Sequence, residues 1–370
     1  MISSFQISNY KNLDSILLDN LKNVNLLVGD NNAGKTNILE ALMLYASQFN
    51  LETIQNILGS RGEDVSMFSS SQASNSLNTF LPLVYNYDGK ILQSSGITLS
   101  TTNRKVSLKI MYRIISQTAT NRTAITLLPI GSTAKIPLTQ KVISREVVLV
   151  AERSSTNHVL MSLQQPLLTQ VIIPPTPITT YRYVHCPSKR ANNLDVLWGN
   201  ITMTPLENYV LNALKVIEPQ ITNFNIVKDK NNRTIPKVSI NNQSPIPIYS
   251  MGDGICHILN IILALLNVQD GILLLDEVDS GLHFNKHKEL WKILIHLSNA
   301  LNIQIFATTH NQDCMRALAE VSDEILTDTN IEPSVFYYIN RDATGALVPN
   351  PTTNYSGIID KIMATPEDVR

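Results

Sequence analysis

The segment Gly29–Thr36 constrains the fold of this chain more than any other feature. It reads Gly-Asp-Asn-Asn-Ala-Gly-Lys-Thr and fits the pattern GxxxxGK followed by Ser or Thr. The apolar run Val24–Val28 precedes it and predicts a short strand, and apolar residues at helical spacing follow it from Ile38 to Tyr45. Because the pattern forms a phosphate-binding loop only between a strand and a helix, we interpret this match as genuine.

The residue types in this segment suit the binding of a nucleotide. Glycines let the backbone curl so that successive N–H groups point at phosphate oxygens, and the following helix N-terminus adds further donors. Lys35 supplies a positive charge to the β and γ phosphates, and Thr36 offers its hydroxyl to Mg²⁺. We therefore predict ATP and Mg²⁺ as ligands, with nucleotide contacts from Gly29, Asp30, Asn31, Asn32, Ala33, Gly34, Lys35, Thr36 and Asn37.

Two carboxylates follow a second apolar run, Ile272–Leu275. A buried strand brings its last residues to the carboxyl edge of a sheet, where ligands bind in such folds. We expect Asp276 to hold Mg²⁺ through water, opposite Thr36, and Glu277 to orient and activate the attacking water. An apolar strand that ends in Asp-Glu is common by itself, but the phosphate loop upstream favours the functional interpretation.

Two weaker signals accompany the acidic pair. The apolar run that ends at Thr309 is followed by His310, which we expect to hydrogen-bond the γ-phosphate or the attacking water. Ser250, Gly252 and Gly254 precede a predicted helix, and a glycine-rich helix N-terminus can bind a second anion. An ordinary loop with a helix cap explains these three residues equally well.

The chain divides into three regions that differ in residue composition and hydrophobic periodicity. Residues 1–60 hold the phosphate loop, and residues 181–370 alternate apolar strands and helices, which predicts a parallel sheet between helices. In that last region we expect helices over Leu206–Ile217, after Gly254 and over Lys286–Leu297, and strands over Ile272–Leu275 and Ile303–Ala307. Residues 61–180 favour a β-rich insertion with strands at Ile97–Ser100, Val106–Tyr112, Ala124–Pro129, Val142–Ala151 and Gln170–Ile173.

Composition narrows the range of partners. The formal net charge of −1 argues against a molecule that is basic throughout and binds nucleic acid with its whole surface. Residues 66–180 nevertheless hold ten basic and only three acidic residues, which leaves contact with DNA or a partner protein open. The three scattered cysteines, the absence of an evident signal peptide and apolar runs too short to span a bilayer predict a cytoplasmic protein without a membrane segment.

The order of these segments resembles that of the ABC-ATPase superfamily, in particular its soluble SMC/RecF branch. Closer still, the residues around Met251, Asp276 and Thr309, and the opening segment up to Leu42, resemble the overcoming-lysogenization-defect ATPases and the stand-alone ATPases of bacterial anti-phage systems of the Septu and PARIS type. The resemblance covers residues 1–50 and 180–370. It implies a P-loop α/β head of the ABC type, with an antiparallel β subdomain and a helical lobe that carries the signature segment.

The resemblance also implies how the site is assembled. In that family two heads pair head-to-tail, so Ser250, Gly252 and Gly254 would contact the γ-phosphate bound by the other copy. Asp279 would be the acid that communicates between the two sites, and Lys35, Thr36, Asp276, Glu277 and His310 would act within their own chain. Asp253 departs from the glycine that many relatives have, no Q-loop glutamine is placed, and no coiled-coil heptads are present.

These observations predict an ATPase that forms a homodimer or a higher homo-oligomer. Only 60 residues follow His310, which leaves no room for the nuclease domain of overcoming-lysogenization-defect proteins. We therefore expect a separately encoded effector, a nuclease or a toxin, in anti-phage defence. A RecF-like DNA-repair ATPase and a non-catalytic, ATP-gated scaffold are the alternatives.

Overall fold

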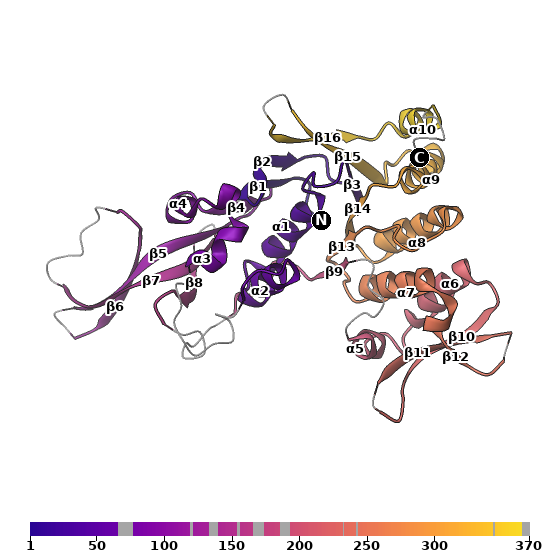
Figure 1. The fold of residues 1–370 in the computed structure, drawn as a ribbon, viewed down its shortest axis with the longest axis horizontal. Helices are drawn as coiled ribbons and strands as arrows, with labels where there is room; N and C mark the ends of the chain where they lie inside the picture. The colour runs from indigo at the N-terminus through magenta and orange to yellow at the C-terminus, as the bar shows by residue number, and fades with distance from the viewer. Residues whose placement is uncertain are drawn as a thin grey trace.

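The computed structural model describes residues 1–65, 77–118, 121–132, 140–153, 156–165, 174–185, 193–231, 233–241, 243–342 and 345–364. The predicted strand at Gln170–Ile173, Cys186 and Lys135 lie outside these residues. Within them the chain forms a parallel sheet flanked by helices, an antiparallel sheet on one side and a mainly helical lobe on the other (Figure 1). Among the helices described, none has the length and apolar character that crossing a membrane requires.

The parallel sheet forms the centre of the molecule, with the strand order β16-β15-β3-β14-β13-β9. All neighbours in it are parallel except β16, which pairs antiparallel with β15 at one edge. Its strands are β3 (Val24–Val28), β9 (Tyr181–His185), β13 (Ile272–Asp276), β14 (Gln304–Thr309), β15 (Ser334–Arg341) and β16 (Leu347–Thr352). The predicted parallel sheet is therefore confirmed.

Helices cover both faces of this sheet, which explains why β3, β13 and β14 are buried at every position. Leu274 joins a core with α1 (Lys35–Ser47) and α2 (Leu51–Ser60). Leu273 and Leu275 point to the opposite face and pack in a core with α7 (Asp253–Leu266), α8 (His287–Ala300) and α9 (Gln312–Thr329). The C-terminal helix α10 (Tyr355–Met363) packs on α9.

The antiparallel sheet has the order β2-β1-β4-β5-β7-β8, with β6 paired to β5. Two of its strands precede the phosphate loop, and the pairing of Ile7 with Leu99 joins them to the later ones. Residues on both sides of position 60 therefore build one sheet. Its strands are β1 (Phe5–Tyr10), β2 (Leu13–Leu18), β4 (Ile97–Ser100), β5 (Lys105–Thr118), β6 (Thr123–Pro129), β7 (Gln140–Arg153) and β8 (Thr156–Ser162).

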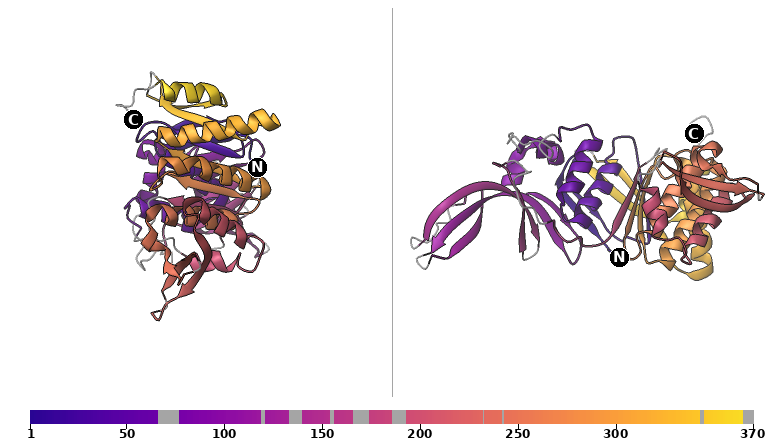
Figure 2. Two further views of the ribbon diagram at one scale, coloured as in Figure 1. Left: turned by 90° about the vertical axis from the view of Figure 1, so that its right-hand side faces the viewer. Right: turned by 90° about the horizontal axis from the view of Figure 1, so that it is seen from below.

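The outer parts of β5, β6 and β7 project from the head as a curved ribbon (Figure 2). The residues 141–145 of β7 are all exposed, because no layer of the head covers this end. Short helices α3 (Leu77–Phe80) and α4 (Gly89–Gln93) and the 3₁₀ turns Leu81–Leu83 and Tyr85–Tyr87 lie between β3 and β4 along the chain, after α2.

The helical lobe follows β9 and contains α5 (Leu194–Gly199) and α6 (Glu207–Ile217). The helix expected over Leu206–Ile217 is confirmed, and it ends before Pro219 as the sequence indicates. A small antiparallel sheet of β10 (Ile221–Lys228), β11 (Thr234–Ile240) and β12 (Ile246–Pro247), which the sequence did not predict, completes the lobe. Trp198 of α5 packs edge-on against Phe224 of β10, with ring centroids 4.9 Å apart.

Candidate functional site

The loop between β3 and α1 has the backbone that phosphate binding requires. Gly29 and Gly34 have φ angles of 147° and 80°, which are unfavourable for residues with a side chain. A Cβ atom on Gly29 would lie 2.5 Å from the carbonyl oxygen of Ile339, and one on Gly34 would lie 3.0 Å from the side chain of Leu13. Both positions therefore need glycine for conformation and for space.

Lys35 folds back over this loop. Its Nζ donates to the carbonyl oxygens of Gly29, at 2.6 Å, and Asp30, at 2.9 Å. Burial lowers the pKa of its ammonium group, while the carboxylates of Asp276, Asp30 and Glu277 oppose this shift. The ammonium group thus lies inside the loop and donates to neutral carbonyl oxygens. The charged oxygens of a phosphate can take the place of these acceptors.

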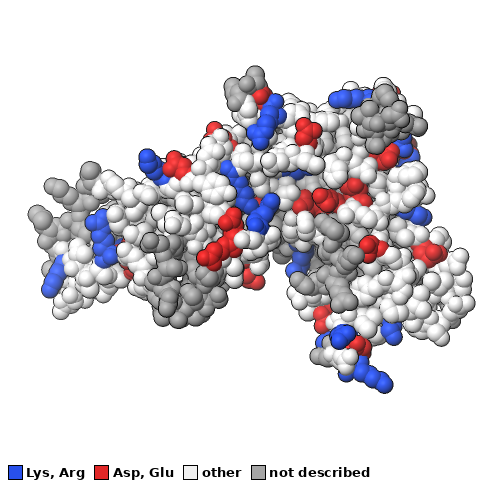
Figure 3. Space-filling view, viewed as in Figure 1, with Lys and Arg blue, Asp and Glu red and all other residues white. Residues whose placement is uncertain are grey.

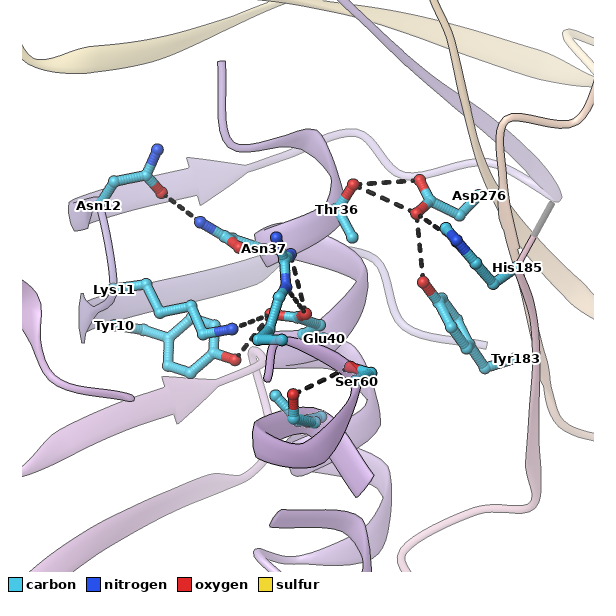
Figure 4. Close-up of polar contacts among 12 residues, drawn as sticks. Tyr10, Lys11, Asn12, Thr36, Asn37, Glu40, Ser60, Tyr183, His185 and Asp276 are labelled. Carbon is cyan, nitrogen blue, oxygen red and sulfur yellow. Dashed lines mark hydrogen bonds and ion pairs between the residues drawn. The ribbon is translucent and has the colours of Figure 1, made fainter. Parts of the chain in front are cut away.

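Asp276, at the end of β13, is the centre of the polar site (Figure 4). Its carboxylate is almost fully buried, with a residue exposure of 3%. Thr36 Oγ1 lies 3.2 Å from both carboxylate oxygens, and Thr308 Oγ1 donates to Oδ1 at 2.7 Å. Oδ2 also accepts from the Tyr183 hydroxyl at 3.2 Å and lies 3.2 Å from His185 Nδ1.

Tyr183 and His185 come from β9, which lies beside β13 with His185 opposite Asp276. Burial, together with the nearby Asp276 carboxylate, raises the pKa of the Tyr183 phenol, so this group stays protonated and donates. Sequence reasoning missed both residues. The only available signal was the alternation Tyr181-Arg182-Tyr183-Val184-His185, which resembles any half-buried strand.

The donor set around Asp276 fits a divalent cation. The Thr36 hydroxyl and the Asp276 carboxylate are hard oxygen donors next to the phosphate loop, the kind of group that Mg²⁺ prefers. Mg²⁺ at such a site keeps several waters and binds through one or two protein oxygens and the substrate phosphates.

Glu277 follows Asp276 with a left-handed backbone, at φ 55°. A residue with a side chain adopts this conformation at a cost of order 1–3 kcal/mol. The Thr308 hydroxyl compensates by accepting the Glu277 N–H at 2.9 Å while it donates to Asp276. One threonine therefore fixes the relative orientation of the two acidic residues.

A cavity of about 260 Å³ brings these groups together. His310, which is exposed, lines it together with Glu277 and Asp276. The other lining residues are Asn31, Asn32, Ala33, Gly34, Lys35, Thr36, Asn37, Arg61, Thr308 and Thr309. A neighbouring cavity of about 410 Å³ is lined in part by Gly29, Asp30, Asn31 and His310. The structure thus places the residues expected to act within one chain around adjoining cavities.

The glycine-rich turn before α7 lies elsewhere. Ser250 and Gly252 are exposed, and Gly252 caps α7 with φ 99° and without any side-chain hydrogen bond. A Cβ atom on Gly254 would lie 2.6 Å from the carbonyl oxygen of Gly281. Ser250, Gly252 and Gly254 are not among the residues that line the phosphate cavity of their own chain.

Asp279 lies in the turn that Gly254 contacts. It accepts a hydrogen bond from Thr309 Oγ1 at 2.6 Å, next to His310. On the other side of this turn, His257 of α7 places Nε2 2.9 Å from the carbonyl oxygen of Val278. The turn is therefore held between the end of β14 and the start of α7.

A second polar cluster, also missed from the sequence, surrounds Glu40 of α1 (Figure 4). This carboxylate, with a residue exposure of 4%, accepts from Tyr10 Oη at 3.1 Å, Lys11 Nζ at 2.5 Å and Arg61 Nε at 3.0 Å. Arg61 lines the phosphate cavity and also an adjoining cavity of about 440 Å³. Glu40 thus holds two basic side chains, those of Lys11 and Arg61, at the boundary of the site.

The basic residues of the β-rich region are spread out. Lys109 pairs with Glu152 and Arg113 with Glu146, while Arg145 stacks on the ring of Tyr112 at 3.7 Å. Figure 3 shows the Lys and Arg side chains of one face of the molecule as separate patches. The described residues of that face form no continuous basic groove.

Comparison with known proteins agrees with this arrangement. Residues 1–162 match the family model described as "AAA ATPase domain", and residues 202–313 match the one described as "AAA domain, putative AbiEii toxin, Type IV TA system". An "ATP/GTP phosphatase" of Helicobacter pylori is 25% identical over 352 residues, which cover 88% of this chain and 89% of that protein. The "DNA replication and repair protein RecF" of Lachnoclostridium phytofermentans is 34% identical over 73 residues, which cover 20% of this chain and 19% of that protein.

A solved structure shows the same fold. An SMC head, solved in complex with the C-terminal winged-helix domain of ScpA, matches 96% of this chain and 99% of its own length with a TM-score of 0.51 and 11% sequence identity. That similarity, the phosphate loop between β3 and α1 and the two sheets lead to one conclusion. The chain has the P-loop ATPase fold of the ABC type that SMC heads share.

Proposed function

We propose that this chain binds ATP with Mg²⁺ and hydrolyses it to ADP and phosphate, in a site that a second copy of the chain completes. The observation that carries this proposal is the convergence of Lys35, Thr36, Asp276 and Glu277 on one cavity. Phosphoryl transfer to water needs a basic group, an oxygen pair for a cation and a second carboxylate.

Each residue takes a role that its surroundings support. Lys35 and the loop N–H groups stabilise charge on the β and γ phosphates. Thr36 and Asp276 would hold Mg²⁺, which would supply further positive charge next to the phosphates. Glu277, whose backbone Thr308 fixes, orients the attacking water. His310, which lines the same cavity, hydrogen-bonds the γ-phosphate.

The base and ribose enter the adjoining cavity of about 440 Å³, which shares Asn32, Asn37 and Arg61 with the phosphate cavity. Tyr87, 65% exposed, offers a ring face to the base, and Arg341 lines the same space. The shared residues support a nucleotide that spans both cavities.

The second copy is needed because the glycine-rich helix end faces no phosphate of its own chain. α7 has 14 residues and a glycine, Gly252, at its N-cap, and the N-terminus of such a helix attracts an anion. Head-to-tail pairing would bring Ser250, Gly252 and Gly254 of one copy to the γ-phosphate of the other. Asp279, bonded to Thr309 beside His310, then connects the two sites.

The deciding measurement is the mass of the Glu277→Gln variant in solution by light scattering, with and without MgATP. We expect the mass to double with ATP while phosphate release stops, because the variant binds ATP but does not activate water. Lys35→Ala should neither bind ATP nor pair. Ser250→Arg should bind ATP and stay single, because the larger side chain obstructs the partner's phosphate. ATP uptake that is unchanged in Lys35→Ala would overturn the proposal.

We place this ATPase in anti-phage defence, where its ATP-dependent pairing controls a separately encoded effector, a nuclease or a toxin. The resemblance of the segments around Met251, Asp276 and Thr309 supports this role, as does the toxin–antitoxin description of the matched family model. In a phage-challenge assay with the neighbouring genes present, Lys35→Ala should abolish protection. Equal protection by both forms would contradict the role but not the ATPase activity.

A RecF-like role in DNA repair is the second candidate, because residues 111–145, which include the outer ribbon, contain no acidic residue. Duplex DNA binding that weakens steeply with salt, and weakens further in the triple variant Arg122→Ala, Lys141→Ala, Arg145→Ala, would favour it. Binding that is insensitive to these substitutions would exclude this ribbon. A purified wild-type chain that pairs with ATP but releases no phosphate would favour a non-catalytic scaffold.

A further inference from the structure

We propose that His185 is a direct nitrogen ligand of the divalent cation, so that the metal site prefers Mn²⁺ over Mg²⁺ more strongly than an all-oxygen site would. This inference rests on the proposed function, because it names the metal preference of the same site. Neither the sequence patterns nor the comparisons assign a role to this histidine.

The first argument is position. β9 lies next to β13 in parallel register, with His185 opposite Asp276. Both side chains therefore emerge at the carboxyl edge of the sheet, where β13 delivers the acidic pair. Thr36 reaches the same carboxylate from the first turn of α1, so three different elements meet at one point.

The second argument is distance. Two ligands at right angles on an octahedral cation, each about 2.1 Å from it, lie about 3.0 Å apart. Asp276 Oδ2 is 3.2 Å from Thr36 Oγ1 and 3.2 Å from His185 Nδ1. Each of these two pairs therefore has the spacing of adjacent ligands, and a cation that binds Oδ2 together with both partners would replace two hydrogen bonds by metal bonds.

The third argument concerns what holds these groups when a cation is bound. Tyr183 donates to Asp276 Oδ2 from the buried side, and its ring is nearly parallel to that of His185, at 13°, with centroids 6.3 Å apart. Tyr183 can therefore keep orienting the carboxylate while His185 turns to the metal. The His185 side chain is 62% exposed, so its ring can turn Nδ1 toward a cation without leaving a packed position.

The chemical consequence is selectivity. Imidazole binds transition metals more strongly than it binds Mg²⁺, which favours oxygen ligands. Replacing one oxygen ligand by a nitrogen therefore favours Mn²⁺ relative to Mg²⁺. A glutamine at this position would present an oxygen of similar reach and restore the preference for Mg²⁺.

The test is pulsed electron paramagnetic resonance on the full chain with Mn²⁺ and ADP, because the spectrum of Mn²⁺ detects a directly bound imidazole nitrogen. We expect a nitrogen coupling in the wild type, altered when the protein contains ¹⁵N-labelled histidine and absent in His185→Gln. His296→Gln, at an exposed position of α8, is the matched control and should keep the coupling. The Mn²⁺ affinity of the ADP complex should fall about tenfold in His185→Gln, with little change for Mg²⁺.

The outcomes separate this inference from the proposed function. Nucleotide-dependent Mn²⁺ binding without a nitrogen coupling, or with one that persists in His185→Gln, overturns the role of His185 and leaves the ATPase intact. Mn²⁺ binding that ADP does not promote, or that Lys35→Ala leaves unchanged, overturns both. Because His185 is largely exposed, its replacement does not empty a core, and the variant should remain folded.

Discussion

Glu40 offers the sharpest test of how the site is held together. Its carboxylate lies almost fully buried on α1 and accepts hydrogen bonds from Tyr10, Lys11 and Arg61. Glu40→Gln removes one negative charge but keeps the shape and one acceptor oxygen. The substitution therefore leaves no cavity and isolates the effect of charge.

The expected loss of stability follows from how far the basic side chains of Arg61 and Lys11 are exposed. Arg61, with 43% of its side chain exposed, can turn into water and contributes at most about 1 kcal/mol. The Lys11 side chain is only 12% exposed and cannot turn into water. Removing one partner of a buried ion pair costs about 3–5 kcal/mol. The loss of stability cannot exceed the cost of removing the proton from Lys11 at pH 7. That cost is about 5 kcal/mol for an ordinary lysine, and it is smaller here because burial lowers the pKa of Lys11. We expect a loss of about 3 kcal/mol.

Urea unfolding followed by tryptophan fluorescence measures this loss, because Trp291 lies fully buried in the core. Lys11→Met in the Glu40→Gln background should recover at least about half of it, since no buried charge is then left unpaired. A loss below about 0.5 kcal/mol in Glu40→Gln, or strict additivity in the double variant, would refute the reasoning.

Two further predictions concern packing and pH. Gly254→Ala should destabilise the protein by about 1–3 kcal/mol in a thermal melt, because its Cβ would lie 2.6 Å from the Gly281 carbonyl oxygen; Gly199→Ala, with open space around it, should change stability by less than about 0.5 kcal/mol. Equal melting temperatures of the two variants would contradict the close contact. Tyr183 has a raised pKa, so its contribution to stability is complete below pH 10 and declines above it. Tyr183→Phe should therefore reduce the slope of stability against pH by about 1 kcal/mol per unit between pH 10 and 11, and an unchanged slope would show that this phenol titrates normally.

The segments that the sequence predicted correctly are those in which buried residues follow one another along the chain. β3, β13 and β14 are buried on both faces, so each is mainly apolar in sequence, and the polar residues that end β13 and β14 mark the edge of the sheet. The phosphate loop is equally local, since its glycines and Lys35 lie within a few positions of one another.

The contacts that the sequence did not reveal join residues far apart in the chain. His185 and Asp276 are 91 positions apart, and only the register of β9 against β13 brings them together. Glu40 resembles an ordinary polar position on an amphipathic helix. The antiparallel sheet and α2 enclose α1, however, so that this carboxylate is buried among basic partners.

β9 also has a mechanical consequence. The chain leaves the antiparallel sheet after β8, passes through β9 and then enters the helical lobe at α5, so this short strand is the covalent tether between the two lobes. One covalent path for tension between the projecting ribbon and the helical lobe therefore runs along β9, whose last residue contacts Asp276. We therefore expect a load that pulls on β9 to separate the imidazole from the carboxylate, at the site where we place the nucleotide.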